Sequence, residues 1–452
     1  MDATRNLRTF YTLIFTQTFS LIGSRMTDLA LSIYIYNQTG DVTPLALVSV
    51  FTILPQIIGA SFAGVLADRW DRRYVMMLSD AGQALGTVIL LVSFLSGGFQ
   101  IWHLYIIAFI KSWFGVFQSP AFTAAVTMLV PDDQRDRANA LQTLTGPLAG
   151  VLAPALTGAL YALIGLNGII GLDLVTFAVA AVVVMFMRIP RPTQTEIGRQ
   201  MQGTVWKEMV GGLKYMWSWR NLFMLTLHIS LVNFLFAGAG MLLTPYLLAR
   251  TGSEATMGLL QAVADFGMII GAIIIGVWGG TRPRIHTIMG GILISSLFMI
   301  GVGSAQTPVL LGVTLVLMTL TAPMVNASAT SLMQAKVPPD IQGRVFAALG
   351  QMTMFFMPLS YLLVGPLVDN VFEPAVNTPG WAVFAPLVGS QPGAGMGLII
   401  MLAGAGLLIT TALVYALPRV RYIESERPDY LPETADSTPE IAAKELHPVG
   451  AE

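Results

Sequence analysis

Twelve long, mostly apolar stretches account for most of this chain. Each is about 20 residues or longer, the length an α-helix needs to cross the hydrocarbon core of a bilayer. They are residues 10–36, 44–67, 74–95, 101–125, 140–164, 168–188, 222–248, 257–280, 285–304, 308–334, 345–368 and 394–417. Charges, Gly/Pro/Asn clusters or short polar runs separate them. The pattern predicts an all-α membrane protein with twelve transmembrane helices, because backbone groups in lipid must be hydrogen-bonded internally.

Charge is scarce and unevenly distributed. The 452 residues include 24 Lys and Arg and 25 Asp and Glu, about half the share usual in soluble chains. Residues 1–9, 189–221 and 419–452 hold 22 of these charges and leave 27 for the other 376 residues. A net charge of −1 without a basic domain argues against a nucleic-acid partner.

Several classes of chemistry have no residues to support them. The chain has no Cys, which excludes disulfides, thiolate metal sites and thiol catalysis. It has no Gly-x-x-x-x-Gly-Lys-Ser/Thr loop, and its His and carboxylate residues do not cluster at metal-ligand spacing. We therefore expect no cofactor, no metal and no enzymatic activity, and an ion or substrate gradient as the energy source.

The basic residues predict the orientation. With both termini in the cytoplasm, 21 of the 24 Lys and Arg lie on the inner side and only Arg250 lies outside. This bias follows the positive-inside rule and fits an even number of crossings. The first apolar stretch carries Arg25 and Asp28 and lacks a clear cleavage site, so it is predicted to be a retained span. We expect a multi-pass protein of the cell inner membrane.

An internal repeat divides the chain into two halves. VPDDQRDRANAL (130–141) resembles VPPDIQGRVFAAL (337–349), and GVLADRWDRR (64–73) resembles GVWGGTRPRI (276–285), at spacings of 207 and 212 residues. The expected units are a six-helix bundle at 1–188, a cytoplasmic linker at 189–221 with an interfacial helix near 205–217, a second bundle at 222–417 and a disordered tail at 418–452. Two such halves suit alternating access around a midplane site.

The first repeated loop carries a family resemblance. GVLADRWDRR is similar to the loop signature of the major facilitator superfamily, and PDDQRDRAN, PPDIQGR and WKEMVGGLKYM resemble its drug-exporter branch, typified by macrolide efflux proteins and enterobactin exporters. The resemblance implies the major facilitator fold and a loop that latches the cytoplasmic ends of the halves when the protein faces outward. Asp71 departs from the signature, which favours Gly there. The predicted gating residues are Gly64, Asp68, Arg69, Arg72, Arg73, Arg137 and Arg344; the arginines could instead serve only as topology determinants.

Charges inside spans are costly and usually face a cavity or a partner. Arg25 and Asp28 lie three residues apart in the first span, where they either neutralise each other or leave Asp28 free to titrate. Lys111, Gly115 and Gln118 share one face of the fourth span. Lys111 stands where the family often has a basic residue that the resemblance links to proton coupling. It could be a counter-ion for Asp28, an anchor for an anionic substrate or a proton carrier.

Fewer polar residues stand out in the rest of the membrane region. In the second half they are Asn233, Asp265 and Asn326, of which Asp265 is either a second proton or cation site or a hydrogen-bonded structural acid. Asp173, near the outer end of the sixth span, is expected to be structural. Residues 146–158 resemble the antiporter-associated Gly-Pro-x-x-Gly-Gly signature, with small residues that let helices approach closely.

These observations predict a monomeric secondary active transporter. The leading hypothesis is proton-coupled export, by antiport, of amphipathic small molecules such as drugs or macrolides. The alternatives are a dedicated exporter of one metabolite, such as a siderophore, and a receptor or scaffold that kept the fold without transporting. The expected partners are a small-molecule substrate, protons and the lipid bilayer.

Overall fold

The computed structural model describes residues 7–69, 71–131, 134–187, 217, 219–337, 339–426 and 429, with backbone alone at 60–62, 64–69, 72, 124, 127, 136, 339–341, 343 and 344. Its long helices in the first half are α1 (Leu7–Thr39), α2 (Thr43–Arg69), α3 (Arg72–Leu95), α4 (Ile101–Leu129) and α5 (Arg135–Phe186). In the second half they are α8 (Arg220–Thr251), α9 (Glu254–Trp278), α10 (Ile285–Ser304), α11 (Pro308–Lys336), α12 (Pro339–Met354), α13 (Met357–Leu367) and α16 (Ala394–Ala416).

Each of the twelve predicted stretches is helical. The fifth and sixth stretches, which share the label α5, are two helices that meet at Gly165 (φ 63°), within the predicted break; glycine adopts this left-handed conformation without strain. The eleventh is divided between α12 and α13. Within the described residues, eight helices are long and apolar enough to cross a membrane. The prediction of an all-helical membrane protein is confirmed, whereas the side of each terminus stays a prediction.

Apolar side chains lie both inside the bundle and on its outer face. The second half has one continuous core that includes Trp219 and Tyr246, and the first half has two smaller clusters, one around Phe10 and one around Met26. Large apolar residues such as Val277 remain exposed on the outside. Lipid tails solvate such residues as well as a protein core would, so this exposure costs little in a bilayer.

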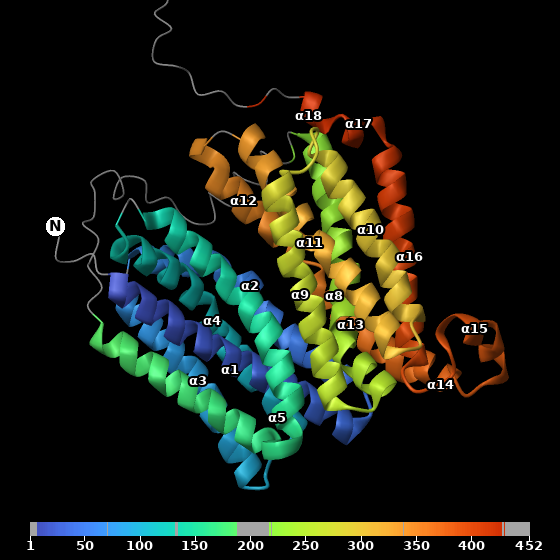
Figure 1. Cartoon of the computed structure of the whole chain (residues 1–452), viewed down its shortest axis with the longest axis horizontal. Helices are drawn as coiled ribbons and strands as arrows, with labels where there is room; N and C mark the ends of the chain where they lie inside the picture. The colour runs from blue at the N-terminus through green and yellow to red at the C-terminus, as the bar shows by residue number, and fades with distance from the viewer. Residues whose placement is uncertain are drawn as a thin grey trace, which may run out of the picture.

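The two halves contact each other at one end. In Figure 1, α5 and α9 converge toward the lower end of the molecule and separate toward the upper end. Gly158 of α5 lies so close to α9 that a Cβ there would be 2.7 Å from the carbonyl oxygen of Glu254. At the same end, Asn37 Nδ2 donates to Glu254 Oε1 at 3.5 Å. The structure therefore has the halves closed at one end.

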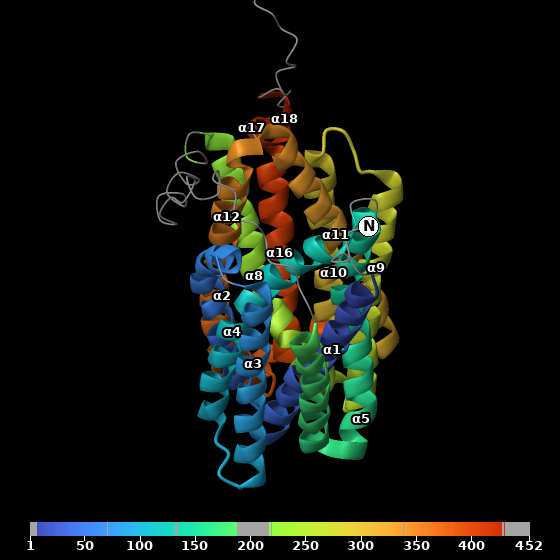
Figure 2. The same cartoon turned by 90° about the vertical axis from the view of Figure 1, so that its left-hand side faces the viewer.

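Short helices cover both ends of the second half. Between α13 and α16 lie η2 (Val368–Phe372), α14 (Glu373–Ala375), η3 (Pro379–Val383) and α15 (Ala385–Val388). At the opposite end (Figure 2), α17 (Pro418–Arg421) and α18 (Ile423–Glu426) occupy the beginning of the stretch that was expected to be disordered. Glu424 Oε1 accepts from the Ile285 amide at the start of α10, at 2.8 Å. This contact orders the start of the tail; residues 430–452 lie outside the described part.

Candidate functional site

A cavity of about 880 Å³ lies mainly against the first half. Helices α1 to α4 supply most of its wall, including the polar side chains of Asp28, Gln83 and Lys111. The second half contributes Met354, at the end of α12, and Tyr361 of α13. A cavity of this size, mostly apolar with a few polar groups, suits a drug-sized ligand.

Asp28 and Lys111 form an ion pair in this cavity. Lys111 Nζ lies 3.6 Å from Asp28 Oδ1, beyond hydrogen-bonding distance, with 13 % of the lysine side chain and 68 % of the aspartate side chain exposed. The stem of Lys111 lies against Gly86 of α3, where a Cβ would be 2.7 Å from Lys111 Cγ. The missing side chain at position 86 thus gives the lysine room to reach Asp28. Of the three roles considered for Lys111, the counter-ion role is the one this geometry favours.

Arg25 and Asp265 meet across the two halves rather than at the cavity wall. Arg25 Nη1 donates to the Gly146 carbonyl of α5 at 3.1 Å. A Cβ at Gly150 would lie 2.8 Å from Asp265 Oδ2 and 3.2 Å from Arg25 Nη1. Both charged groups therefore converge on the same small residue. Of the two partners considered for Asp28, Lys111 and not Arg25 is the one at ion-pair distance among the described residues.

Gln118 belongs to a buried polar network that sequence reasoning did not anticipate. Its Nε2 donates to Asp80 Oδ1 at 2.5 Å and to Gln17 Oε1 at 2.9 Å, and its Oε1 accepts from Gln83 Nε2 at 2.6 Å. Asp80 is only 1 % exposed. Although Asp80 is the one acid in the apolar stretch 74–95, it was not selected. A search for every charge inside a predicted span would have found it.

The two predicted asparagines do not line the cavity. Asn233 Nδ2 donates to the Thr353 carbonyl at 3.1 Å and so joins α8 to α12. Asn326 lies on an exposed face of α11. Neither residue is brought together with Asp28, Lys111 or Asp265, so the polar sites predicted for the second half do not form one cluster.

Small residues of α5 make the closest contact between the halves. A Cβ at Gly258 of α9 would overlap the Pro154 carbonyl and lie 3.0 Å from the Gly158 Cα. Both α5 residues belong to the stretch 146–158 that resembles the antiporter signature. Because glycine has no side chain, the two backbones can touch directly. The resemblance therefore marks the contact surface of α5 with the second half.

Part of the predicted gating region is described. Asp71, the residue that departs from the loop signature, is the N-cap of α3, and its Oδ1 accepts from the Arg73 amide at 3.0 Å. Aspartate is among the best N-cap residues, so the local turn is compatible with it. Arg73 Nη2 donates to the Met185 carbonyl, and Arg137 is exposed at the start of α5. Gly64 is described by its backbone, and the side chains of four others lie outside the described part: Asp68, Arg69, Arg72 and Arg344. Of the expected interfacial helix, only Trp217 is described.

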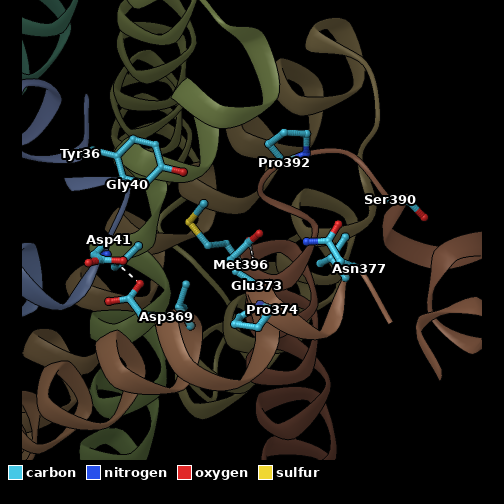
Figure 3. A pocket seen from close by; sticks show the side chains of 13 residues that line it. Tyr36, Gly40, Asp41, Asp369, Glu373, Pro374, Asn377, Ser390, Pro392 and Met396 are labelled. Carbon is cyan, nitrogen blue, oxygen red and sulfur yellow. Dashed lines mark hydrogen bonds between the residues drawn. The ribbon is translucent and has the colours of Figure 1, made fainter. Parts of the chain in front are cut away.

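A second pocket, of about 380 Å³, lies where the halves touch. Figure 3 shows Asp369 beside the segment that leads into α2. Its two carboxylate oxygens accept from the amides of Val42 and Thr43 at 2.8 and 2.7 Å. Asp369 thereby caps the N-terminus of α2 from the other half. In the same pocket, Glu373 Oε1 accepts from the Met396 amide at 2.9 Å.

The described residues contain no group of three or more His, Cys, Asp or Glu that could hold a metal ion. What the fold and the site have instead is a membrane-embedded helical bundle in two halves, with charged side chains against a ligand-sized cavity. This arrangement is typical of secondary transporters.

The family model described as Major Facilitator Superfamily matches residues 13–360. The chain belongs to this superfamily. It is 27 % identical over 374 residues to macrolide efflux protein A of Streptococcus pyogenes, covering 80 % of this chain and 90 % of that protein. It is 25 % identical over 334 residues to the enterobactin exporter EntS of Citrobacter koseri, covering 72 % and 77 %.

A solved structure has the same fold over nearly the whole chain. It is that of a bacterial homolog of the human lysosomal transporter Spinster, in an inward-facing and unoccupied conformation, with a TM-score of 0.75, 16 % identity and coverage of 96 % of this chain and 100 % of that one. The resemblance to the superfamily and to its drug-exporter branch, first drawn from the loops, is confirmed by these relatives.

Proposed function

We propose that this protein exports amphipathic small molecules, such as drugs or macrolides, across the cell inner membrane in exchange for protons. The observation that carries this proposal is the Asp28–Lys111 ion pair in the wall of a cavity of about 880 Å³. A paired carboxylate at a cavity wall can exchange its lysine partner for a cationic substrate or for a proton. Distant similarity to macrolide efflux protein A supports export of such compounds.

The orientation follows from the distribution of Lys and Arg. With both termini inside, the end where Asp369 caps α2 is the outer one, and the halves separate on the cytoplasmic side (Figure 1). The structure then corresponds to the inward-facing state, ready to accept a substrate from the cytoplasm or the inner leaflet. Export requires the contacts of Asp369 and of Gly158 with Gly258 to open while the cytoplasmic ends close. We propose that one chain performs this cycle as a monomer.

The test is accumulation of a panel of fluorescent amphipathic compounds in an efflux-deficient host. Cells that express the protein should retain less dye than cells with an empty vector, and a protonophore should remove the difference. Lys111→Gln, compared at the same expression level, should lose most of the protonophore-sensitive component. Unchanged accumulation across a broad panel would contradict drug export.

A second candidate is dedicated export of one anionic metabolite, such as a catecholate siderophore. Two observations favour it: the ammonium group of Lys111 at the cavity, which could anchor an anionic substrate, and the similarity to the enterobactin exporter EntS. In vesicles, this alternative predicts uptake of a labelled iron-free catecholate that is inhibited by unlabelled catecholate but not by cationic dyes. A complete lack of substrate-dependent flux in active reconstitutions would instead favour the receptor or scaffold hypothesis.

A further inference from the structure

Three buried polar atoms without a hydrogen-bond partner belong to one neighbourhood around Asp173. They are Thr27 Oγ1 of α1, Lys111 Nζ of α4 and Asp173 Oδ2 of α5. The Asp173 side chain is completely buried, and the groups that act on it electrostatically are Lys111 and Asp28. From the sequence, Asp173 is expected to be structural. In the structure it is hydrogen-bonded to Ser24, which lines the cavity, and it lies within electrostatic reach of the cavity ion pair.

Residues of helix α1 lie between Asp173 and the cavity, and one of them, Ser24, lines the cavity wall. Ser24 Oγ donates to Asp173 Oδ1 at 3.1 Å. Thr27 faces the same carboxyl group, but its Oγ1 and Asp173 Oδ2 do not meet the geometry of a hydrogen bond. A Cβ at Gly23 would lie 3.1 Å from Asp173 Oδ1, so α1 approaches α5 closely here. Oδ1 of Asp173 therefore has a hydrogen-bond donor, whereas its buried Oδ2 has none.

The charges in this neighbourhood do not balance. Lys111 supplies one positive charge to two carboxyl groups, those of Asp28 and Asp173. Arg25, also on α1, is directed to the Gly146 carbonyl and to Asp265, and Asp80 of α3 is held by Gln17 and Gln118. An ionised carboxylate without a counter-charge is costly to bury inside a membrane segment. A proton on one of the two acids removes this cost.

We propose that Asp173 is a proton-binding residue and that Lys111 is shared between it and Asp28. While Lys111 pairs with Asp28, Asp173 is protonated at Oδ2, and its O–H can donate to Thr27 Oγ1 after a small shift. When a cationic substrate or a proton takes Asp28, the Lys111 ammonium turns to Asp173. The Oδ2–H bond then breaks, the proton leaves to water in the cavity, and the N–H of Lys111 replaces it.

This sharing makes substrate and proton compete although they bind different acids. Asp28 is the exposed group that meets the substrate, and Asp173 is the buried group that holds the proton. The inference rests on the proposed antiport for its physiological meaning. Its physical content, a carboxyl group whose protonation depends on Lys111 and Asp28, does not depend on any substrate.

The test is an infrared pH titration of the full-length protein in lipid vesicles, without substrate, following the C=O band of protonated carboxyl groups. Asp173→Asn should remove one titrating component from this band. Lys111→Gln should move the midpoint of that component up by about one pH unit, because a nearby cation favours the ionised carboxylate. Asp28→Asn should move it down, because Lys111 is then free to pair with Asp173. Asp80→Asn, which removes another buried acid, is the matched control and should leave the component in place.

Opposite shifts in Lys111→Gln and Asp28→Asn are not expected of an acid with a purely structural role. The proposal is overturned if Asp173→Asn leaves the band unchanged or if neither charge variant moves the midpoint. Should Asp173→Asn not fold, the two charge variants still decide, because a band that persists in Asp28→Asn cannot belong to Asp28. Since no substrate is present, the outcome is separate from that of the efflux assay, and either proposal can fail alone.

Discussion

The two halves share a fold but differ in where their charged groups lie. In the first half, Asp28 and Lys111 line the cavity, and Asp80 and Asp173 are buried close behind its wall. Among the described residues, the second half gives the cavity Met354 and Tyr361, and its acid Asp265 lies against α5. Its Asp369 closes the contact between the halves by capping α2, at the end that is the outer one in the proposed orientation. We therefore propose that the first half holds the ion chemistry and that the second half acts mainly as the surface against which it opens and closes.

The largest effect is expected at the backbone contact between the halves. Gly258→Ala puts a methyl group into the Pro154 carbonyl, so α5 and α9 cannot close as observed. Overpacking of this kind costs roughly 1–3 kcal/mol, enough to reduce the inward-facing population about 5- to 150-fold. Transport in vesicles should fall accordingly while the thermal unfolding midpoint changes little, because the outward-facing state relieves the clash.

Gly276 of the same helix provides the control. A Cβ there meets nothing within 4 Å, so Gly276→Ala should transport like the wild type. If Gly258→Ala is as active as Gly276→Ala, the α5–α9 contact is not needed for the cycle, and the second half would have a smaller part than proposed.

The next prediction compares the effects of replacing one acid in each half. Asp28→Asn should lower proton-driven accumulation by at least about tenfold, equivalent to about 1.4 kcal/mol of coupling, because it removes the cavity partner of Lys111. Asp265→Asn should lower it less, since its carboxylate faces Arg25 and Gly150 rather than the cavity. Initial rates of uptake into inverted vesicles, with and without a pH gradient, measure both. The reverse order of effects would place the ion chemistry in the second half.

Much of the fold could be predicted from the sequence because lipid leaves few alternatives. Apolar length and the need to bond every backbone group fix the helices, and all twelve stretches are helical. The break predicted between residues 164 and 168 is also found, since the backbone turns at Gly165. The caps made by Asp369 and Glu424 escaped prediction, since each joins residues more than 100 positions apart.

The site was predicted only in part. The resemblance and the cost of membrane charges together pointed to Asp28 and Lys111, which the structure brings into contact. Sequence spacing could not tell which charge faces which, so Arg25 was considered as a partner of Asp28 although it points to α5. Asp173 was set aside for its place near a helix end. Only three-dimensional packing brings it next to Ser24 at the cavity wall.

A smaller effect is expected at the outer contact between the halves. Asp369→Ala removes the cap of α2, and loss of an N-cap costs about 1 kcal/mol, which corresponds to about a fivefold change in the ratio of the two states. Since the chain has no Cys, two engineered cysteines near the outer ends of α2 and α13 can carry spectroscopic labels without background. The distribution of distances between the two labels should shift to longer values, which belong to the state that is open on the outer side.

The exposed Asp41, in the same pocket, is the matched control for this measurement. Its side chain does not cap α2, so Asp41→Ala should leave the distance distribution unchanged. An unchanged distribution in Asp369→Ala would mean that the glycine contact between α5 and α9 alone holds the outer side closed.

The smallest effect is expected at the inner end of the second half. Lys336 Nζ lies 2.7 Å from Asp429 Oδ1, and this hydrogen bond holds the pKa of Asp429 below its usual range. A carboxylate with a depressed pKa in the folded state stabilises the fold above its unfolded-state pKa, and the contribution disappears as the pH falls through the lower value. Because Asp429 is exposed, the contribution should not exceed the ~0–1 kcal/mol of surface ion pairs. Asp429→Asn should therefore lower the thermal unfolding midpoint slightly at pH 7, and the difference from the wild type should vanish in acid and shrink in high salt. A difference that grows as the pH falls would show that the tail is held to the second half by other contacts, such as that of Glu424 with α10.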